Sequence, residues 1–207
     1  MSRTARRRRS EGDAEPHRES IPAAYFDQRY ARADDPWGLA ERWYERRKYA
    51  LTLAGLPRER YASGYEPACS IGVLTRGLAE RCDRLLAVDS APKAVGAARA
   101  AVPDPHVRVE RAHLPADLPD ETFDLVVLSE FLYYFALPDL ELLLKGVRAR
   151  LRPDGHLVCV HRRDLGPGGG WDGFNVHRVV ERVTGLVPIT HLDDQGFELD
   201  VLGCHRG

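Results

Sequence analysis

The feature that most restricts the fold is the run Tyr65–Thr75, together with a short apolar stretch that ends about twenty residues later in Asp89. Glu66 stands near the start of the run, and small residues follow it at alternate positions: Ala68, Ser70 and Gly72. This layout predicts a strand, a tight turn and a helix, and then a second strand whose terminal carboxylate can bind the hydroxyls of a ribose. The sequence therefore predicts a nucleotide-binding βαβ unit.

Two details distinguish this unit from one that binds a dinucleotide. The turn lacks the third glycine that helps to seat a pyrophosphate group. Glu66 lies directly before the turn, where its carboxylate can accept a hydrogen bond from an ammonium or amide group. Both details favour the methionine end of S-adenosylmethionine over a phosphate, and a nicotinamide enzyme is the disfavoured alternative.

The rest of the chain alternates expected strands with expected helices. Phe123–Glu130 is predicted as a buried parallel strand, Leu151–Val160 as a helix end, a turn and another strand, and Ile189–Leu202 as a terminal hairpin. Expected helices cover Trp37–Ala54, Leu74–Cys82, a segment capped by Ser90, a segment opened by Pro138 and a segment capped by Asn175. This order predicts an α/β fold, a doubly wound and mostly parallel sheet with helices on both faces.

The same segments resemble class I S-adenosylmethionine-dependent methyltransferases. A closer similarity, to the group related to the rhizobial nodulation protein S, is carried by Asp35–Trp37, Trp43–Tyr49, Glu66–Thr75, Ser129–Tyr134 and Val160–Arg162. The resemblance implies a Rossmann-like fold of seven strands with an antiparallel last strand. It also implies S-adenosyl-L-methionine as cofactor and transfer of its methyl group to an amine or hydroxyl of a small molecule, for example one like an amino sugar.

The resemblance further implies which residues bind the cofactor. Asp89 is expected to bind the ribose and Lys48, on a lid formed by residues 21–56, the methionine carboxylate. His113 is expected either to face the adenine beside Leu114 or to be a surface histidine. The full set is Trp37, Lys48, Glu66, Ala68, Ser70, Gly72, Asp89, Ser90, His113, Leu114 and Ser129. Ala68 and Ser70 stand where many relatives have glycine, so a positive φ at either residue would strain the backbone.

Three residues are candidates for the acceptor side: Glu130, His161 and His177. Either histidine can take a proton near neutral pH if it faces the acceptor, and each is otherwise a core or capping residue. Glu130 is expected to hold an amine, to hold the ammonium group of the cofactor, or to cap a helix. The segment Ser129–Leu132 differs from the proline-rich motif with which adenine-directed enzymes hold a flipped base, which favours a small-molecule acceptor.

Length, composition and charge limit the possible domain organisation and partners of the chain. A chain of 207 residues predicts one domain, over residues 21–207, after a basic tail, residues 1–20, that has too few apolar side chains to order itself. The formal net charge of −1 gives no general attraction to nucleic acid or to anionic lipid, and no apolar run is long enough to cross a membrane.

The four cysteines are scattered along the chain, which predicts reduced thiols in a cytoplasmic protein and no metal site. Two further functions stay open, a nucleic-acid methyltransferase that uses the arginines of the tail and a module that binds the cofactor without catalysis. The sequence leaves the oligomeric state undetermined.

Overall fold

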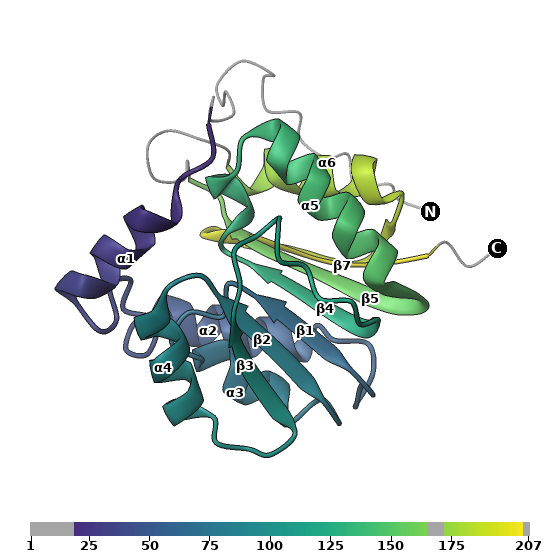
Figure 1. Cartoon of the computed structure of the whole chain (residues 1–207). Coiled ribbons are helices and arrows are strands. Elements are labelled where there is room, and N and C mark those ends of the chain that lie inside the picture. Colours follow the sequence, from purple (N-terminus) through teal and green to yellow (C-terminus); the bar gives the residue numbers. More distant parts are fainter. Residues whose placement is uncertain (1–18, 165–171, 205–207) are drawn as a thin grey trace.

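The computed structural model describes residues 19–164 and 172–204 (Figure 1). The predicted tail over residues 1–18 and the glycine-rich segment 166–170, which the sequence predicts as a mobile loop at the substrate mouth, lie outside the described residues. Ser20, the last residue of the predicted tail, already contacts the domain, since its hydroxyl donates to Asp139 and accepts from the Ala136 N–H group.

A seven-stranded sheet forms the centre of the domain, with strand order β3-β2-β1-β4-β5-β7-β6 (Figure 1). The strands are β1 (Gly64–Pro67), β2 (Leu85–Asp89), β3 (Val107–Arg111), β4 (Phe123–Ser129), β5 (Leu151–Arg162), β6 (Val187–Asp193) and β7 (Phe197–Gly203). Strands β1 to β5 pair in parallel, and β7 runs antiparallel to both of its neighbours. The predicted fold class is confirmed, including the antiparallel last strand and the terminal hairpin.

Helices cover both faces of this sheet (Figure 1). They are α1 (Ala23–Arg32), α2 (Trp43–Ala54), α3 (Val73–Ala79), α4 (Pro92–Ala101), the short 3₁₀ helix η1 (Leu132–Tyr134), α5 (Leu137–Arg150) and α6 (Gly173–Thr184). Helices α5 and α6 pack on one face, and α2, α3 and α4 pack on the other. The central strand β4 is apolar and buried on both sides, as expected of a parallel strand between two helical layers. No helix in the described ranges is long and apolar enough to pass through a bilayer.

Strand order reverses at β1 and β4, because the chain builds outward from β1 through β2 and β3 and then returns to add β4 on its other side. In open α/β sheets, ligands bind in the crevice beyond the carboxyl ends of the strands at this switch point. The fold therefore places the β1 turn, the end of β2 and the end of β4 around one crevice.

Three expectations about helix boundaries are wrong. The helix expected from Trp37 begins at Trp43, because the Asp35 carboxylate accepts the N–H groups of Leu39 and Ala40 and so holds the preceding residues in a separate turn. Ser90 does not cap α4, because Asp89 Oδ1 accepts the Ala91 N–H group in that place. Asn175 does not cap α6, because the cap is Asp172, whose carboxylate accepts the Asn175 N–H group.

Candidate functional site

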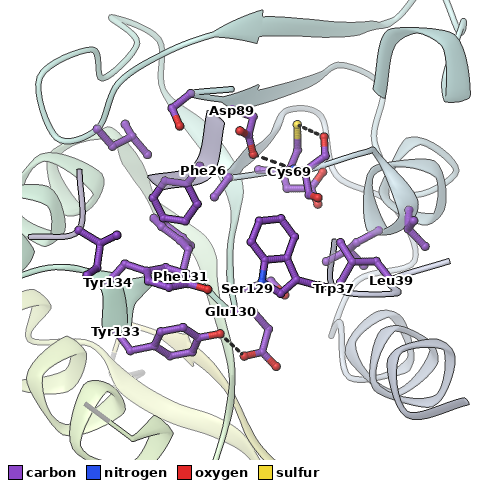
Figure 2. A pocket seen from close by; sticks show the side chains of 18 of the residues that line it. Phe26, Trp37, Leu39, Cys69, Asp89, Ser129, Glu130, Phe131, Tyr133 and Tyr134 are labelled. Carbon is purple, nitrogen blue, oxygen red and sulfur yellow. Dashed lines mark hydrogen bonds between the residues drawn. The ribbon is translucent and has the colours of Figure 1, made fainter. Parts of the chain in front are cut away.

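A cavity of about 660 Å³ lies at the switch point, which is a size typical of small-molecule sites. Its walls come from the carboxyl ends of β1, β2 and β4 and from the N-terminal segment that includes α1 and α2. Figure 2 shows Asp89 and Cys69 at one end, Glu130 and Tyr133 at the other, and the Trp37 indole between them. All of the predicted cofactor residues line this cavity except Gly72.

The turn after β1 is strained. Ala68 and Ser70 have φ angles of 58° and 53°, in the left-handed region that disfavours residues with a Cβ atom. The Ser70 N–H group donates to Asp89 Oδ2 at 2.9 Å, and the Ser70 hydroxyl pairs with the hydroxyl of Tyr30 on α1. Backbone strain held in place by its surroundings is typical of ligand-binding turns. The strain that the sequence predicted at these two positions is therefore present.

Gly72 has a structural role in this turn. Its φ angle is +83°, and a Cβ atom there would lie 3.0 Å from the Cα atom of Ala98 on α4. The glycine thus permits close packing of the turn against α4, and it contributes no surface to the cavity.

Asp89 ends β2 with its side chain toward the cavity (Figure 2). Its two carboxylate oxygens accept the N–H groups of Ser70 and Ala91, and burial raises the pKa of this carboxyl group above its ordinary value. Each carboxylate oxygen has a second lone pair, so the group can accept further hydrogen bonds from a ribose diol. Asp89 therefore fits the expected ribose site and also fixes the β1 turn.

We expect Asp89→Ala to weaken binding of S-adenosylhomocysteine by about ten- to a hundredfold, because a hydrogen bond to a charged group contributes roughly 1.5–3 kcal/mol. Titration calorimetry measures the affinity. Asp120→Ala, at an exposed surface position, is the matched control and should bind as the wild type does. Unchanged affinity in Asp89→Ala would show that this carboxylate does not contact the ligand.

Glu66 lies at the end of β1 and is 3% exposed. Its Oε2 atom has no hydrogen-bond partner among the described residues, and burial raises the pKa of the carboxyl group to about 8. A buried acceptor without a partner is costly unless a ligand supplies the donor. The side chain therefore fits the expected ammonium group of an amino-acid moiety.

The raised pKa of Glu66 predicts how binding depends on pH. Below pH 8 the empty site holds this carboxyl group mostly protonated, whereas a ligand ammonium favours the carboxylate, so binding must release a proton. The affinity for S-adenosylhomocysteine should therefore rise between pH 6 and 8, by up to about tenfold per unit. Glu66→Gln should remove this slope, and calorimetry across the pH range checks it. A wild-type slope no steeper than that of the variant would refute the assignment.

Lys48 is fully buried in α2, and its ammonium group lies between two carboxylates. The Nζ atom is 2.7 Å from Oε2 of Glu45 and 2.6 Å from Oε1 of Glu130. The sequence predicted a partner on the cofactor for Lys48, but in this structure the charge is compensated within the protein. We call Glu45, Lys48 and Glu130 the acidic triad, since two carboxylates around one ammonium group leave one negative charge.

Glu130 is held firmly at the end of β4. Its Oε2 atom accepts the Tyr133 hydroxyl at 2.9 Å and the Arg162 N–H group at 3.1 Å (Figure 2). Its φ angle of 59° is in the left-handed region, so the local backbone is strained as it is in the β1 turn. The structure therefore fixes this carboxylate at the far end of the cavity from Asp89.

The other predicted cofactor residues also lie in the wall of the cavity. Trp37 is half-buried and packs edge-to-face against Tyr30 at a centroid distance of 5.3 Å. His113 is exposed at the rim of the cavity, and Leu114 beside it is half-buried. Ser90 and Ser129 are likewise half-buried in the wall.

His161 and His177 are not exposed to this cavity. His161 is fully buried, and its ring nitrogens face the Leu132 N–H group and His177. His177 is 2% exposed and contacts His161 and Asp200. The expectation that His161 points toward the acceptor is wrong for this structure. The next residue, Arg162, lines the cavity, because successive side chains of a strand point to opposite faces.

Sequence reasoning missed several residues of the site. Tyr30 belongs to α1, a helix that the sequence did not predict, and it reaches the β1 turn through its hydroxyl. Glu45 was also missed, although its spacing of three residues from Lys48 on an expected helix indicates an ion pair. Other missed residues of the wall are Phe26, Leu39, Arg42, Tyr44 and Tyr49.

The chain is similar in sequence to known methyltransferases and to nodulation proteins. The sequence pattern of the family described as Methyltransferase domain matches residues 65–159. Nodulation protein S of Bradyrhizobium diazoefficiens is 31% identical over 140 residues, which cover 66% of this chain and 67% of that protein. Nodulation protein S of Rhizobium tropici is 33% identical over 135 residues, or 64% of this chain, and the match spans only 57% of the relative's length.

Solved structures agree with the sequence comparisons. A Pseudomonas syringae structure assigned to the methyltransferases is 42% identical, with a TM-score of 0.69, and the match covers 78% of this chain and 99% of that one. The N-methyltransferase NodS from Bradyrhizobium japonicum WM9, in complex with S-adenosyl-L-homocysteine, has a TM-score of 0.74 at 23% identity. That match covers 88% of this chain and 98% of NodS, and it supports the fold.

Proposed function

This chain belongs to the class I S-adenosylmethionine-dependent methyltransferases related to nodulation protein S, and we propose that it transfers a methyl group to an amine of a small molecule. The choice of an amine as the acceptor rests on the acidic triad, which lies at the end of the cavity opposite Asp89. An amino sugar is one acceptor of this class.

The residues around the cavity suggest how the cofactor is held. Asp89 would bind the ribose, Glu66 the ammonium group, and Leu114 with His113 the adenine, while Trp37 would cover it. S-adenosylmethionine supplies, when bound, a methyl group activated by a positively charged sulfur, so that the protein mainly has to align the reacting atoms.

Glu130 is placed to orient the acceptor. Its carboxylate can accept a hydrogen bond from an amine N–H group while it keeps the bonds from Tyr133 and Arg162. The amine must be neutral to attack, so any proton it carries leaves for water first. As the nitrogen–carbon bond forms and the carbon–sulfur bond breaks, positive charge develops on the nitrogen.

The net negative charge of the acidic triad favours that change. Glu130 and Glu45 stabilise the positive nitrogen of the transition state, and fixed charges of this kind are among the larger contributions to catalysis. The methylated ammonium product then loses its proton to water. An alcohol gains less from the triad, because its oxygen must lose its proton as it attacks, so less positive charge develops on the attacking atom.

Methyl-labelled S-adenosylmethionine tests this proposal when it is supplied with a panel of small amines, which includes amino sugars, and with alcohols and RNA. We expect label in one or more amines. Label in RNA would favour the nucleic-acid alternative, and tight binding of S-adenosylhomocysteine without transfer to any acceptor would favour a non-catalytic module. Either result would contradict the proposal.

The state of the cysteines indicates the cellular compartment in which the protein acts. All four are among the described residues, all are free thiols, and three of them are buried. Free thiols are typical of proteins in a reducing compartment, so we propose the cytoplasm as the site of action.

A further inference from the structure

A chain of hydrogen bonds runs beneath the cavity, from η1 to the β6–β7 hairpin. The Leu132 N–H group faces His161 Nε2 at 3.4 Å, and His161 Nδ1 lies 3.0 Å from His177 Nε2. His177 Nδ1 lies 2.7 Å from Asp200 Oδ2, and Asp200 Oδ1 lies 2.7 Å from His191 Nδ1. His161, His177 and Asp200 are at most 2% exposed, whereas the His191 side chain is 37% exposed.

The Leu132 end fixes the direction of every bond in this chain. A backbone N–H group only donates, so His161 Nε2 must accept, and the proton of the neutral ring is then on Nδ1. His161 Nδ1–H donates to His177 Nε2, and His177 Nδ1–H therefore donates to the Asp200 carboxylate. Burial holds the pKa of His161 well below its ordinary value, in agreement with a neutral ring.

Asp200 contributes a buried carboxylate to this arrangement. Burial raises the pKa of its carboxyl group, but the hydrogen bonds with His177 and His191 outweigh burial and bring the pKa below its ordinary value. A buried carboxylate is stable only when such donors surround it. Asp200 therefore anchors His177 and His191, and through His177 and His161 it holds the backbone of η1.

We propose that His161, His177 and Asp200 are positioning residues that hold η1, and with it Tyr133 and Glu130, in the geometry of the acceptor site. Tyr133 follows Leu132 directly, its ring packs edge-to-face on His161 at 5.7 Å, and its hydroxyl donates to Glu130. Arg162 follows His161 directly, and its N–H group donates to the same carboxylate oxygen. Both hydrogen bonds to Glu130 Oε2 thus come from residues next to this chain of hydrogen bonds, whereas Oε1 faces Lys48.

A metal ion is the competing explanation of the same residues. The ligand atoms of His177, Glu198 and Asp200 lie within 4.8 Å of one another, as they would around a cation. A metal on His177 Nδ1 would move the proton to Nε2, which would donate to His161 Nδ1 and so force the His161 proton onto Nε2. That proton would then point at the Leu132 N–H group, which is also a donor. The backbone donor therefore favours the hydrogen-bonded chain.

The tautomers give a direct test that needs no methyl acceptor. Nitrogen-15 spectra of the histidine rings, recorded on the full chain at pH 7, should show His161 and His177 as neutral rings protonated on Nδ1. His177 protonated on Nε2, or either ring as an imidazolium, would overturn the proposal. Addition of zinc chloride should leave these tautomers and the melting temperature unchanged, whereas a zinc-induced rise in melting temperature with a change of the His177 tautomer would establish the metal site instead.

A variant tests the positioning itself. His177→Ala should speed amide hydrogen exchange in residues 130–134 by about tenfold or more, since the η1 turn loses its anchor. Its affinity for S-adenosylhomocysteine should stay within about threefold, because the residues assigned to the cofactor lie elsewhere. His106→Ala, which removes another partly buried histidine, is the control.

Unchanged exchange in residues 130–134 of His177→Ala would overturn the proposal. If this variant fails to fold, the histidine tautomers of the wild type still test the proposal. The inference rests on the proposed function only for the role of Glu130. A failure to methylate any amine would therefore count against that function only. The tautomers and the exchange rates would still test the positioning of η1.

Discussion

Replacing Glu130 by glutamine should lower kcat/KM for the amine acceptor by about 10²–10³-fold, the range measured when one fixed polar group that stabilises transition-state charge is removed. The change keeps the size of the side chain but removes the charge that faces the developing ammonium. The affinity for S-adenosylhomocysteine should change little, because Glu130 lies at the opposite end of the cavity from Asp89. Steady-state kinetics and calorimetry on the same preparations measure the two effects.

Glu141→Gln is the matched control, since Glu141 is partly exposed on α5 and pairs with Arg182 at the surface. It should leave kcat/KM unchanged. A Glu130→Gln variant that keeps its turnover but binds the cofactor poorly would assign Glu130 to the cofactor's ammonium group and would contradict its role toward the acceptor.

Replacing Lys48 by methionine should destabilise the fold by about 3–5 kcal/mol, the usual cost of removing one partner of a buried ion pair. Methionine fills the space of the lysine stem, but Glu45 and Glu130 are then left close together without the cation between them. Because both carboxylates keep some exposure to solvent, with side chains 10% and 18% exposed, we expect the lower end of this range. Urea denaturation measures the change in the free energy of unfolding.

Lys145→Met is the control, since Lys145 is exposed on α5 and its replacement should cost less than about 0.5 kcal/mol. Adding Glu45→Gln to Lys48→Met should recover part of the lost stability, because it removes one of the two uncompensated charges. A cost below about 1 kcal/mol for Lys48→Met would mean that the acidic triad does not form in solution.

The fold was largely predictable because its main determinants are local. The apolar run Leu125–Leu128 has room for a strand but not for a helix of ordinary length, and the small residues after Glu66 permit a tight turn. Helix α1 was missed because its buried contacts are few and arise from tertiary packing. Tyr30, the buried residue of that helix, lies four residues after Phe26 on the face that lines the cavity, and its hydroxyl bonds to Ser70.

The acceptor side was less predictable for two physical reasons. Alternation along β5 decides whether His161 or Arg162 faces the cavity, and a shift of one residue in the expected strand reverses the answer. Glu130, the second partner of Lys48, lies 82 residues away and directly after β4, so only the folded chain brings these two charges together. The hydrogen-bonded chain from Leu132 to His191 joins five elements, η1, β5, α6, β7 and β6, and has no counterpart in local spacing.

Acceptor selectivity tests the central claim most directly. Rates of methyl transfer should be measured for an amine from the panel and for the alcohol of the same carbon skeleton, with the wild type and with Glu130→Gln. We predict that the wild type methylates the amine and leaves the alcohol nearly unchanged, and that Glu130→Gln loses most of the activity toward the amine. Equal rates for the amine and the alcohol, unaffected by Glu130→Gln, would contradict the assignment of the acidic triad as the amine site.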